Sequence, residues 1–290
     1  MKAATPDSRL EAAAGLAFVL LWSTGYLAAQ FGLSGSGAFT LAVLRFAGSA
    51  AIIGLWLLLT RPARPTASEL RHAACAGLLL QAGFFGFAYA GMRAGVPPAT
   101  AGLIAGLMPL TTALGAAWLL GERMRRYTPL GLLLGLAGVL FVVGPKLTEP
   151  GSLLGYGFML LSLLSLSFGT LYQKRHGTQL DPRLSLTVQL LASFFALLPV
   201  AWLLEGFHYE PTPAVLGGTA WAILVNSCAG LLLYLWLLRQ GAAARVAGLF
   251  YLVPPATAVL AALVLGAEFG WHELVGLLLA SLGVWLGQRD

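Results

Sequence analysis

Two pairs of polar side chains that could hold a small ligand recur in this sequence at a spacing of 145 residues. Gln81 pairs with Asn226, Tyr89 pairs with Tyr234, and all four residues lie within long apolar runs. An amide or a phenol buried in an apolar environment needs a hydrogen-bond partner. From the sequence alone, that partner is either a neighbouring helix or the polar groups of a bound substrate.

Arg45 is the one charged residue that lies well inside an apolar run. A cation without partners in hydrocarbon is costly, so Arg45 is expected to face protein or water. It either attracts a substrate carboxylate or holds its helix against neighbours through carbonyl and hydroxyl groups. Its counterpart 144 residues later is Gln189, which is polar but uncharged, and this favours the structural role.

Aromatic residues in the same runs are candidates for the wall of a cavity that takes a planar ligand. Aromatic side chains would supply apolar and π surface to such a ligand. The alternative is that they face lipid. The predicted substrate-binding set joins these residues to the polar pairs: Trp22, Tyr26, Gln81, Phe84, Phe85, Tyr89, Asn226, Tyr234 and Tyr251.

Prolines interrupt two of the apolar runs at matching places, Pro109 after AGLIAGLM and Pro254 after AGLFYLV. Proline removes a backbone donor and kinks a helix, which frees carbonyls to face a cavity. Membrane helices also tolerate proline in general. Paired interruptions in two halves of a chain nevertheless indicate the binding site of a transporter.

The elements that must position these residues are apolar helices. Hydrophobic residues make up 58 % of the 290 residues, charged residues make up 10 %, and the mean hydropathy is +0.82. This composition excludes an ordinary soluble enzyme. Runs long enough to cross a bilayer predict an all-α membrane protein with ten spans. The spans lie near residues 11–31, 38–60, 70–92, 97–120, 127–144, 153–173, 184–204, 214–238, 244–266 and 271–288.

The basic residues predict the orientation of these spans. With a cytoplasmic N-terminus, the cytoplasmic segments hold fourteen Lys and Arg and the outer segments hold two, and Arg45 completes the 17. Short loops follow the positive-inside rule, so both termini are expected in the cytoplasm of a plasma-membrane protein. Because the positive charges are spread over six separate segments, they do not form a nucleic-acid patch.

The two halves of the chain resemble each other, which predicts an internal repeat. Residues 101–122 read AGLIAGLMPLTTALGAAWLLGE, and residues 247–268 read AGLFYLVPPATAVLAALVLGAE. We expect repeat one over 1–145 and repeat two over 146–290, within a single membrane domain. Because each repeat has an odd number of spans, the second enters the membrane from the opposite face.

Carboxylates are missing from the span interiors. All eleven Asp and Glu, and all four His, fall in loops, tails or span ends. The sequence therefore predicts transport with little direct coupling to protons, and no intramembrane catalytic or metal site. It also carries no Walker A loop, which excludes an ATP-driven pump. We expect no enzyme activity, cofactor or metal; a channel and an intramembrane enzyme are the less favoured alternatives.

Four ordered motifs give a more specific resemblance: LLWSTGYLAAQ, LRF, a mid-span proline followed by LLGER, and GLLLGLAGVLFVVG. Together they resemble the ten-helix transporters of the drug/metabolite transporter superfamily, EamA type, over the whole chain. The resemblance implies a cavity lined by spans one, three and four and by spans six, eight and nine. It also implies that Arg45 is a general feature of the family.

The aromatic-rich third and eighth spans are most similar to bacterial aromatic amino-acid exporters. This implies a secondary transporter of the bacterial inner membrane that exports aromatic or large neutral amino acids by alternating access. Export of other metabolites or drugs, such as nucleosides or sugars, is the alternative. The expected partners are the lipid bilayer and a small-molecule substrate; the oligomeric state is not predicted.

Overall fold

A computed structural model describes residues 8–60, 65–121, 125–146, 152–176, 180–230, 233, 252–267 and 270–287. These residues form helices, and one isolated β-bridge joins Ser36 to Tyr209 among them. Six of the helical segments are long and apolar enough to cross a membrane, and four shorter apolar segments accompany them. The ten segments follow the order of the ten predicted spans, which confirms the prediction of an all-helical membrane protein.

The first half of the chain contains five helical segments. They are α1 (Ser8–Leu33), α2 (Ala38–Thr60), the continuous α3 (Ala67–Gly77), η1 (Leu78–Gly83) and α4 (Phe84–Arg93), the pair α5 (Pro98–Ala105) and α6 (Met108–Leu120), and α7 (Thr128–Val143). Thr66 and Glu69 begin α3 with a capping box, in which each side chain accepts a backbone N–H of the other residue. Prolines in the first turns begin α5, α6 and α7, where a missing N–H is harmless. A short 3₁₀ turn, η2 (Gly144–Lys146), follows α7.

The second half repeats this order. It contains α8 (Ser152–His176), α9 (Pro182–Glu205), α10 (Pro213–Trp221) continuous with η3 (Ala222–Ala229), α13 (Val253–Leu265) and α14 (Trp271–Gly287). Asp181 and Thr212 cap α9 and α10 by accepting backbone N–H groups. Gly206 ends α9 with φ of +59°, in the left-handed region that glycine enters readily.

The segments η1 and η3 are π-helical and occupy the same place in each half, in the middle of the third and eighth spans. A π-helical turn inserts an extra residue into the helix and occurs often at functional sites. The fourth span is also irregular, because α5 stops at Ala105 and α6 starts at Met108. The sequence predicted a kink there, and the structure has two separate helices with Pro109 in the first turn of the second.

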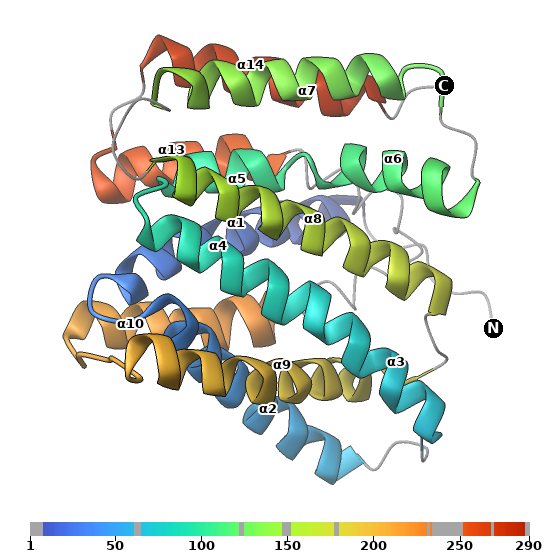
Figure 1. Ribbon diagram of the computed structural model, residues 1–290, viewed down its shortest axis with the longest axis vertical. Coiled ribbons are helices and arrows are strands. Elements are labelled where there is room, and N and C mark those ends of the chain that lie inside the picture. Colours follow the sequence, from blue (N-terminus) through green and yellow to red (C-terminus); the bar gives the residue numbers. More distant parts are fainter. Residues whose placement is uncertain are drawn as a thin grey trace.

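The helices stack in layers, with α7 and α14 paired at one side of the molecule and α2 and α9 toward the other (Figure 1). Glycines let α7 and α14 approach closely, since a side chain at Gly131 or Gly138 would meet the backbone of α14. Thr128 Oγ1 also donates to the Gly287 carbonyl at 2.8 Å. The small residues of the fifth and tenth spans thus form the packing surface between α7 and α14.

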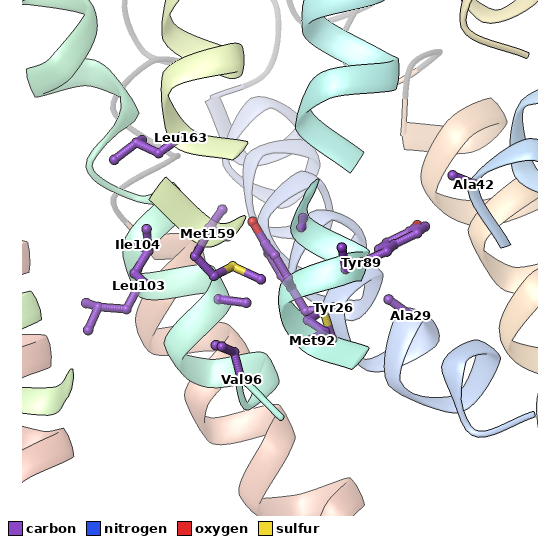
Figure 2. Packing of buried hydrophobic residues seen from close by; sticks show 14 of the residues in the cluster. Tyr26, Ala29, Ala42, Tyr89, Met92, Val96, Leu103, Ile104, Met159 and Leu163 are labelled. Atoms are coloured by element: carbon purple, nitrogen blue, oxygen red, sulfur yellow. The ribbon is translucent and has the colours of Figure 1, made fainter. Parts of the chain in front are cut away.

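A buried core lies between these layers, and apolar side chains also cover the outside. Figure 2 shows part of the core, where Tyr26 of α1, Met92 of α4 and Met159 of α8 gather. On the outside, Leu59, Leu203 and Trp118 are 77 %, 79 % and 79 % exposed. Large apolar side chains exposed to this degree fit a surface that is covered by lipid.

Candidate functional site

A cavity of about 540 Å³ lies between the two halves of the chain. Its described walls come from α1, α2, η1, α4, α5 and α6 of the first half and from α8, α9, η3 and the start of α13 in the second. This volume is in the range of small-molecule binding sites. The cavity extends to the end of the molecule where α8 ends and α9 begins, and exposed Gln173 and Lys174 line it there. We call this end the open end.

Arg45 lies at the closed side of the cavity and is 6 % exposed. Its Nη1 donates to the Tyr89 hydroxyl at 2.7 Å, and its Nε donates to Ser227 Oγ at 3.0 Å. The guanidinium also lies over the Phe85 ring, 3.9 Å from the centroid. These partners come from two other elements, so Arg45 joins α2 to α4 and η3. They are all neutral, and the positive charge therefore remains uncompensated by any carboxylate among the described residues.

Aromatic side chains form the rest of this closed side. Trp22 and Tyr26 of α1 face Phe84, Phe85 and Tyr89 of α4 across the narrow part of the cavity. Phe84 and Phe85 pack with ring centroids 4.6 Å apart, and Phe85 lies 5.9 Å from Tyr89. The structure thus brings five of the predicted aromatic residues together. Tyr234 and Tyr251 of the predicted set lie outside the described residues.

The two predicted amides, Gln81 and Asn226, both line the cavity and both lie in π-helical segments. Asn226 Nδ2 donates to the Leu21 carbonyl at 2.6 Å and to Thr24 Oγ1 at 3.4 Å, which ties η3 to α1. Asn226 Oδ1 is buried without a hydrogen-bond partner in the described structure. Asn226 therefore holds η3 against α1 and also keeps one buried acceptor without a partner.

The prolines mark where the cavity meets the ends of helices. Pro109 lies in the first turn of α6, and Pro254 lies in the first turn of α13. The two breaks touch, because a side chain at Gly106 would meet Pro254 Cγ. Pro109 and Val253, beside Pro254, both line the cavity.

Hydroxyl groups contact the starts of α13 and α6 in both halves. Ser23 of α1 donates to the Val253 carbonyl at 3.3 Å, and Thr257 Oγ1 donates to the same carbonyl at 2.8 Å. In the first half, Ser167 of α8 lies 2.6 Å from Thr111 Oγ1, which donates to the Leu107 carbonyl at 3.3 Å.

Sequence reasoning missed a polar belt near the open end of the cavity. The belt consists of Thr170 and Gln173 of α8 and of Ser185 and Gln189 of α9. Gln189 Nε2 donates to Ser185 Oγ at 3.2 Å. The only sequence signal for the belt was Gln189, as the uncharged counterpart of Arg45. The other three lie near span ends, where polar residues are common and carry no distinctive pattern.

The opposite end of the molecule, which we call the sealed end, is closed by contacts between the α1–α2 and α9–α10 connections. Ser36 is fully buried and forms the bridge to Tyr209. Gly37 donates its N–H to the His208 carbonyl at 3.1 Å, and Glu210 donates its N–H to the Gly35 carbonyl at 2.7 Å. These backbone bonds join the two halves of the chain in the manner of a small piece of sheet.

Glu205, the last residue of α9, fastens the sealed end further. Its carboxylate accepts the backbone N–H groups of Phe39 at 3.0 Å and Thr40 at 2.8 Å, and the Thr40 hydroxyl at 2.8 Å. A carboxylate at the first turn of a helix satisfies its free N–H groups and interacts favourably with its dipole. A side chain at Gly37 would collide with this carboxylate. We call this contact the Glu205 clasp.

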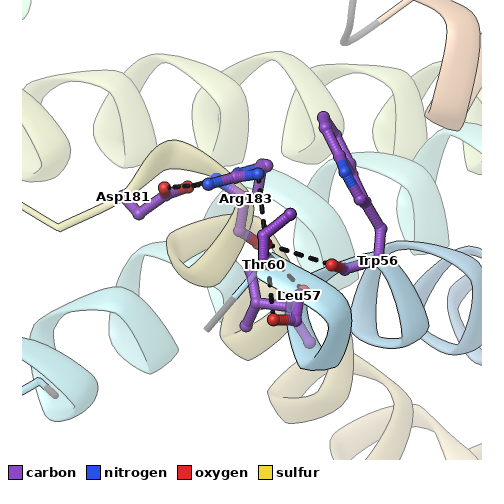
Figure 3. Close-up of polar contacts among 6 residues, drawn as sticks. Trp56, Leu57, Thr60, Asp181 and Arg183 are labelled. Atoms are coloured by element: carbon purple, nitrogen blue, oxygen red, sulfur yellow. Dashed lines mark hydrogen bonds and ion pairs between the residues drawn. The ribbon is translucent and has the colours of Figure 1, made fainter. Parts of the chain in front are cut away.

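The open end has a weaker contact between the same two helices (Figure 3). Arg183 Nη1 in the first turn of α9 donates to Thr60 Oγ1, at the end of α2, at 3.2 Å. Arg183 also lies over the Trp56 ring and pairs with Asp181 at 2.6 Å. Its hydrogen bond to the Asp181 carboxylate lowers the pKa of that carboxyl below its usual value.

The site therefore combines one buried cation, an aromatic wall and amide or hydroxyl groups, in a cavity shared by two similar halves. Among the described residues, no group of three His, Cys, Asp or Glu side chains is placed to hold a metal ion. The sequence profile of the EamA-like transporter family matches residues 9–144 and matches again over residues 153–287. The chain belongs to the EamA-like transporter family. Members of this family are transporters, not enzymes, so the chain is a multi-pass membrane transporter of a small molecule.

Individual relatives agree with this assignment. A "probable amino-acid metabolite efflux pump" of Salmonella typhimurium is 26 % identical over 96 % of this chain and 95 % of its own length. The transporter YoaV of Bacillus subtilis is 23 % identical over 93 % of this chain and 94 % of its own. The transporter YvbV of the same organism is 28 % identical, but the chain spans only 56 % of its length. A solved crystal structure with 22 % identity superposes with a TM-score of 0.69 over 96 % of this chain and 98 % of its own, which supports the fold.

Proposed function

We propose that this transporter exports amino acids with aromatic or large neutral side chains, and that the cavity is their binding site. The observation that carries the proposal is the composition of the cavity: five aromatic side chains beside Arg45, with Gln81 and Asn226 facing the same space. The aromatic wall suits an aromatic side chain, and Arg45 suits a carboxylate. The similarity to an amino-acid metabolite efflux pump supports the same substrate class.

The mechanism we propose is alternating access between two inverted repeats, 1–145 and 146–290, within one membrane domain. In the structure the cavity reaches the open end, while the Glu205 clasp and the neighbouring backbone bonds close the sealed end. We assign the open end to the cytoplasm, since the basic residues of the sequence concentrate on that side. The structure then corresponds to the state that loads substrate from the cytoplasm of a bacterial inner-membrane protein.

The charged groups of the cavity lining bear on whether transport is coupled to protons. The described lining of the cavity contains no carboxylate to carry a proton through the membrane. We therefore propose facilitated export down the substrate gradient. An imposed pH gradient that alone drove accumulation of substrate would contradict this proposal.

Counterflow into liposomes tests the substrate class. Purified protein should exchange labelled phenylalanine and should not exchange nucleosides or sugars, which are the alternative substrates. Gln81→Ala and Asn226→Ala should each lower phenylalanine flux roughly tenfold, if each removes one net hydrogen bond of about 1.4 kcal/mol. Exchange of nucleosides or sugars without phenylalanine would refute the proposal.

Thiol labelling of whole cells tests the orientation. His208 is exposed at the sealed end, and Arg175 is exposed at the open end. In a chain with both native cysteines replaced, an impermeant maleimide added outside should label His208→Cys and should not label Arg175→Cys. The reverse pattern would invert the assignment of the two ends.

A further inference from the structure

The charges around the cavity are one-sided. Arg45 lines it with neutral partners only, and the described lining includes no Asp or Glu. The long segment 231–251, which lies outside the described residues apart from position 233, contains no Asp or Glu in its sequence. The nearest carboxylate along the chain is Asp181, beside Pro182 of the lining, and Arg183 already pairs with it at 2.6 Å. A positively charged substrate therefore meets Arg45 and finds no carboxylate among the described residues of the lining.

Arg45 is built to accept an anion. A guanidinium has five N–H donors, and the described partners of Arg45 are one hydroxyl on Nη1 and one on Nε. Tyr89 and Ser227 thus fix the orientation of the guanidinium from one side, and further donors are left for a ligand. The cavity borders the same arginine. A carboxylate is the common biological anion that matches this fork of donors.

The ammonium group of an amino acid has no comparable receptor. The Phe85 ring, which could hold a cation over its face, is already covered by Arg45. The buried acceptor Asn226 Oδ1 is packed against α1, 3.7 Å from the place of a side-chain carbon at Gly25. Neutral carbonyls, hydroxyls, the Gln81 amide and the other aromatic faces remain, and none of these carries the full negative charge of a carboxylate.

We propose that this transporter recognises its substrates by their carboxylate, so that aromatic carboxylic acids without an amino group are also substrates and aromatic amines are excluded. This inference rests on the proposed function, because it concerns the same cavity and the same aromatic wall. It makes Arg45 the residue that determines specificity, with Tyr89 and Ser227 as its positioning residues.

Three ligands with one ring system test the inference: L-phenylalanine, 3-phenylpropionate, which lacks the amine, and 2-phenylethylamine, which lacks the carboxylate. Binding to the purified protein in detergent is measured by thermal stabilisation and by competition, because both small analogues leak across bilayers. The affinity for 3-phenylpropionate should lie within roughly threefold of that for phenylalanine, and 2-phenylethylamine should bind at least about tenfold more weakly. Equal or tighter binding of the amine, or binding of phenylalanine without binding of 3-phenylpropionate, would overturn the inference and leave the proposed function standing. If none of the three ligands binds, the proposed function fails as well.

A substitution of Arg45, with a matched control, tests whether this residue determines the selectivity for carboxylates. Arg45→Gln should weaken 3-phenylpropionate binding about tenfold and leave 2-phenylethylamine binding unchanged or improved. Arg93→Gln removes an exposed cation at the end of α4 and is the matched control, with no expected effect. Unchanged binding of 3-phenylpropionate to Arg45→Gln would refute the role of Arg45.

Because Arg45 also holds α4 and η3, a second variant leaves its contacts in place. Gln81→Glu adds a carboxylate to the same cavity and should shift the preference toward 2-phenylethylamine, and Gln30→Glu, exposed on α1, should not. If Gln81→Glu folded and kept the preference for 3-phenylpropionate over the amine unaltered, charge would not control selectivity.

Discussion

The sealed end and the open end of the cavity are built from corresponding parts of the two halves, yet their contacts differ. At the sealed end, η3 and α10 lie against α1, with Asn226 bonded to the Leu21 carbonyl and Gly218 in backbone contact with α1. Toward the open end, η1 and α3 face α8, and Gln81, the counterpart of Asn226, lines the cavity. Corresponding helices of the two halves therefore close one end and leave the cavity accessible at the other, which is what one state of an alternating-access cycle requires.

The ends of the α2–α9 pair differ in the same way. The last residue of α9, Glu205, accepts three hydrogen bonds from the start of α2. The last residue of α2, Thr60, accepts one from Arg183 near the start of α9. A carboxylate on free helix N–H groups is a stronger contact than an exposed hydroxyl beside an arginine. The difference in closure between the two ends therefore comes from a few side chains on a common scaffold.

The largest effect on phenylalanine flux is expected from a substitution that separates α1 from α10 at the sealed end. A side chain at Gly218 would meet the Ala28 carbonyl and the Gly32 N–H, whereas one at Gly217 would meet nothing within 4 Å. Gly218→Val should lower phenylalanine flux at least about thirtyfold, for an overpacking cost on the order of 2 kcal/mol. Gly217→Val, its neighbour on α10, is the control and should keep its flux. Normal flux in Gly218→Val would show that α1 and α10 need not touch.

The next largest effect is expected from weakening the Glu205 clasp, which should make the sealed end open more often. In a chain without native cysteines, the labelling rate of buried Ser36→Cys reports opening of the sealed end. Glu205→Gln should raise that rate about tenfold, because a charged acceptor at the start of α2 becomes neutral. Glu210→Gln is the control at the same end, since that carboxylate is exposed and lies 3.6 Å from His208 Nε2. A labelling rate that Glu205→Gln leaves unaltered would mean that the backbone bonds alone keep this end closed.

A smaller effect on the opening of the sealed end is expected to distinguish Asn226 from Gln81. Asn226→Ala removes the bond to Leu21 and should raise the Ser36→Cys labelling rate about fivefold, for a net hydrogen bond of about 1 kcal/mol. Gln81→Ala should leave that labelling unchanged, although it lowers flux. Equal labelling rates of the two variants would show that Asn226 in η3 does not hold the sealed end closed any more than Gln81 in η1 does.

The smallest effect belongs to the open end. Because the pKa of Asp181 is lowered in the folded protein, its pairing with Arg183 stabilises the fold above the unfolded pKa near 4 and is lost as pH falls through the folded pKa. The pair is partly exposed, so Asp181→Asn should cost only a few tenths of a kcal/mol at pH 7. Thermal unfolding in detergent should show this cost shrinking as pH falls below about 4. A cost that persists at the lowest pH would point to the lost α9 cap in place of the charge.

Most of the fold could be predicted because apolar runs and repeats are properties of the chain itself. The second span, for example, was predicted at 38–60, and α2 occupies Ala38–Thr60. The pairing of Gln81 with Asn226 was equally visible as a spacing. Their π-helical geometry was not, because an extra residue in a helical turn leaves no period in an apolar sequence.

The contacts of the site were harder to predict. Arg45 was expected to need partners, but Tyr89 and Ser227 are 44 and 182 residues away, and only the packing of helices brings them to it. Glu205 was classed with the other span-end carboxylates, and nothing local distinguishes it from them. Its partners lie 165 and 166 residues earlier in the chain.

That separation has a consequence for how the protein is made. The ribosome releases α2 long before α9, so the first turn of α2 waits without its carboxylate acceptor until about 165 further residues have been synthesised. The Thr128 hydroxyl of α7 likewise waits for the Gly287 carbonyl, 159 residues later. The helices α2 and α7 of the first repeat are therefore synthesised before these hydrogen-bond partners exist. The helices α9 and α14 of the second repeat supply the partners later.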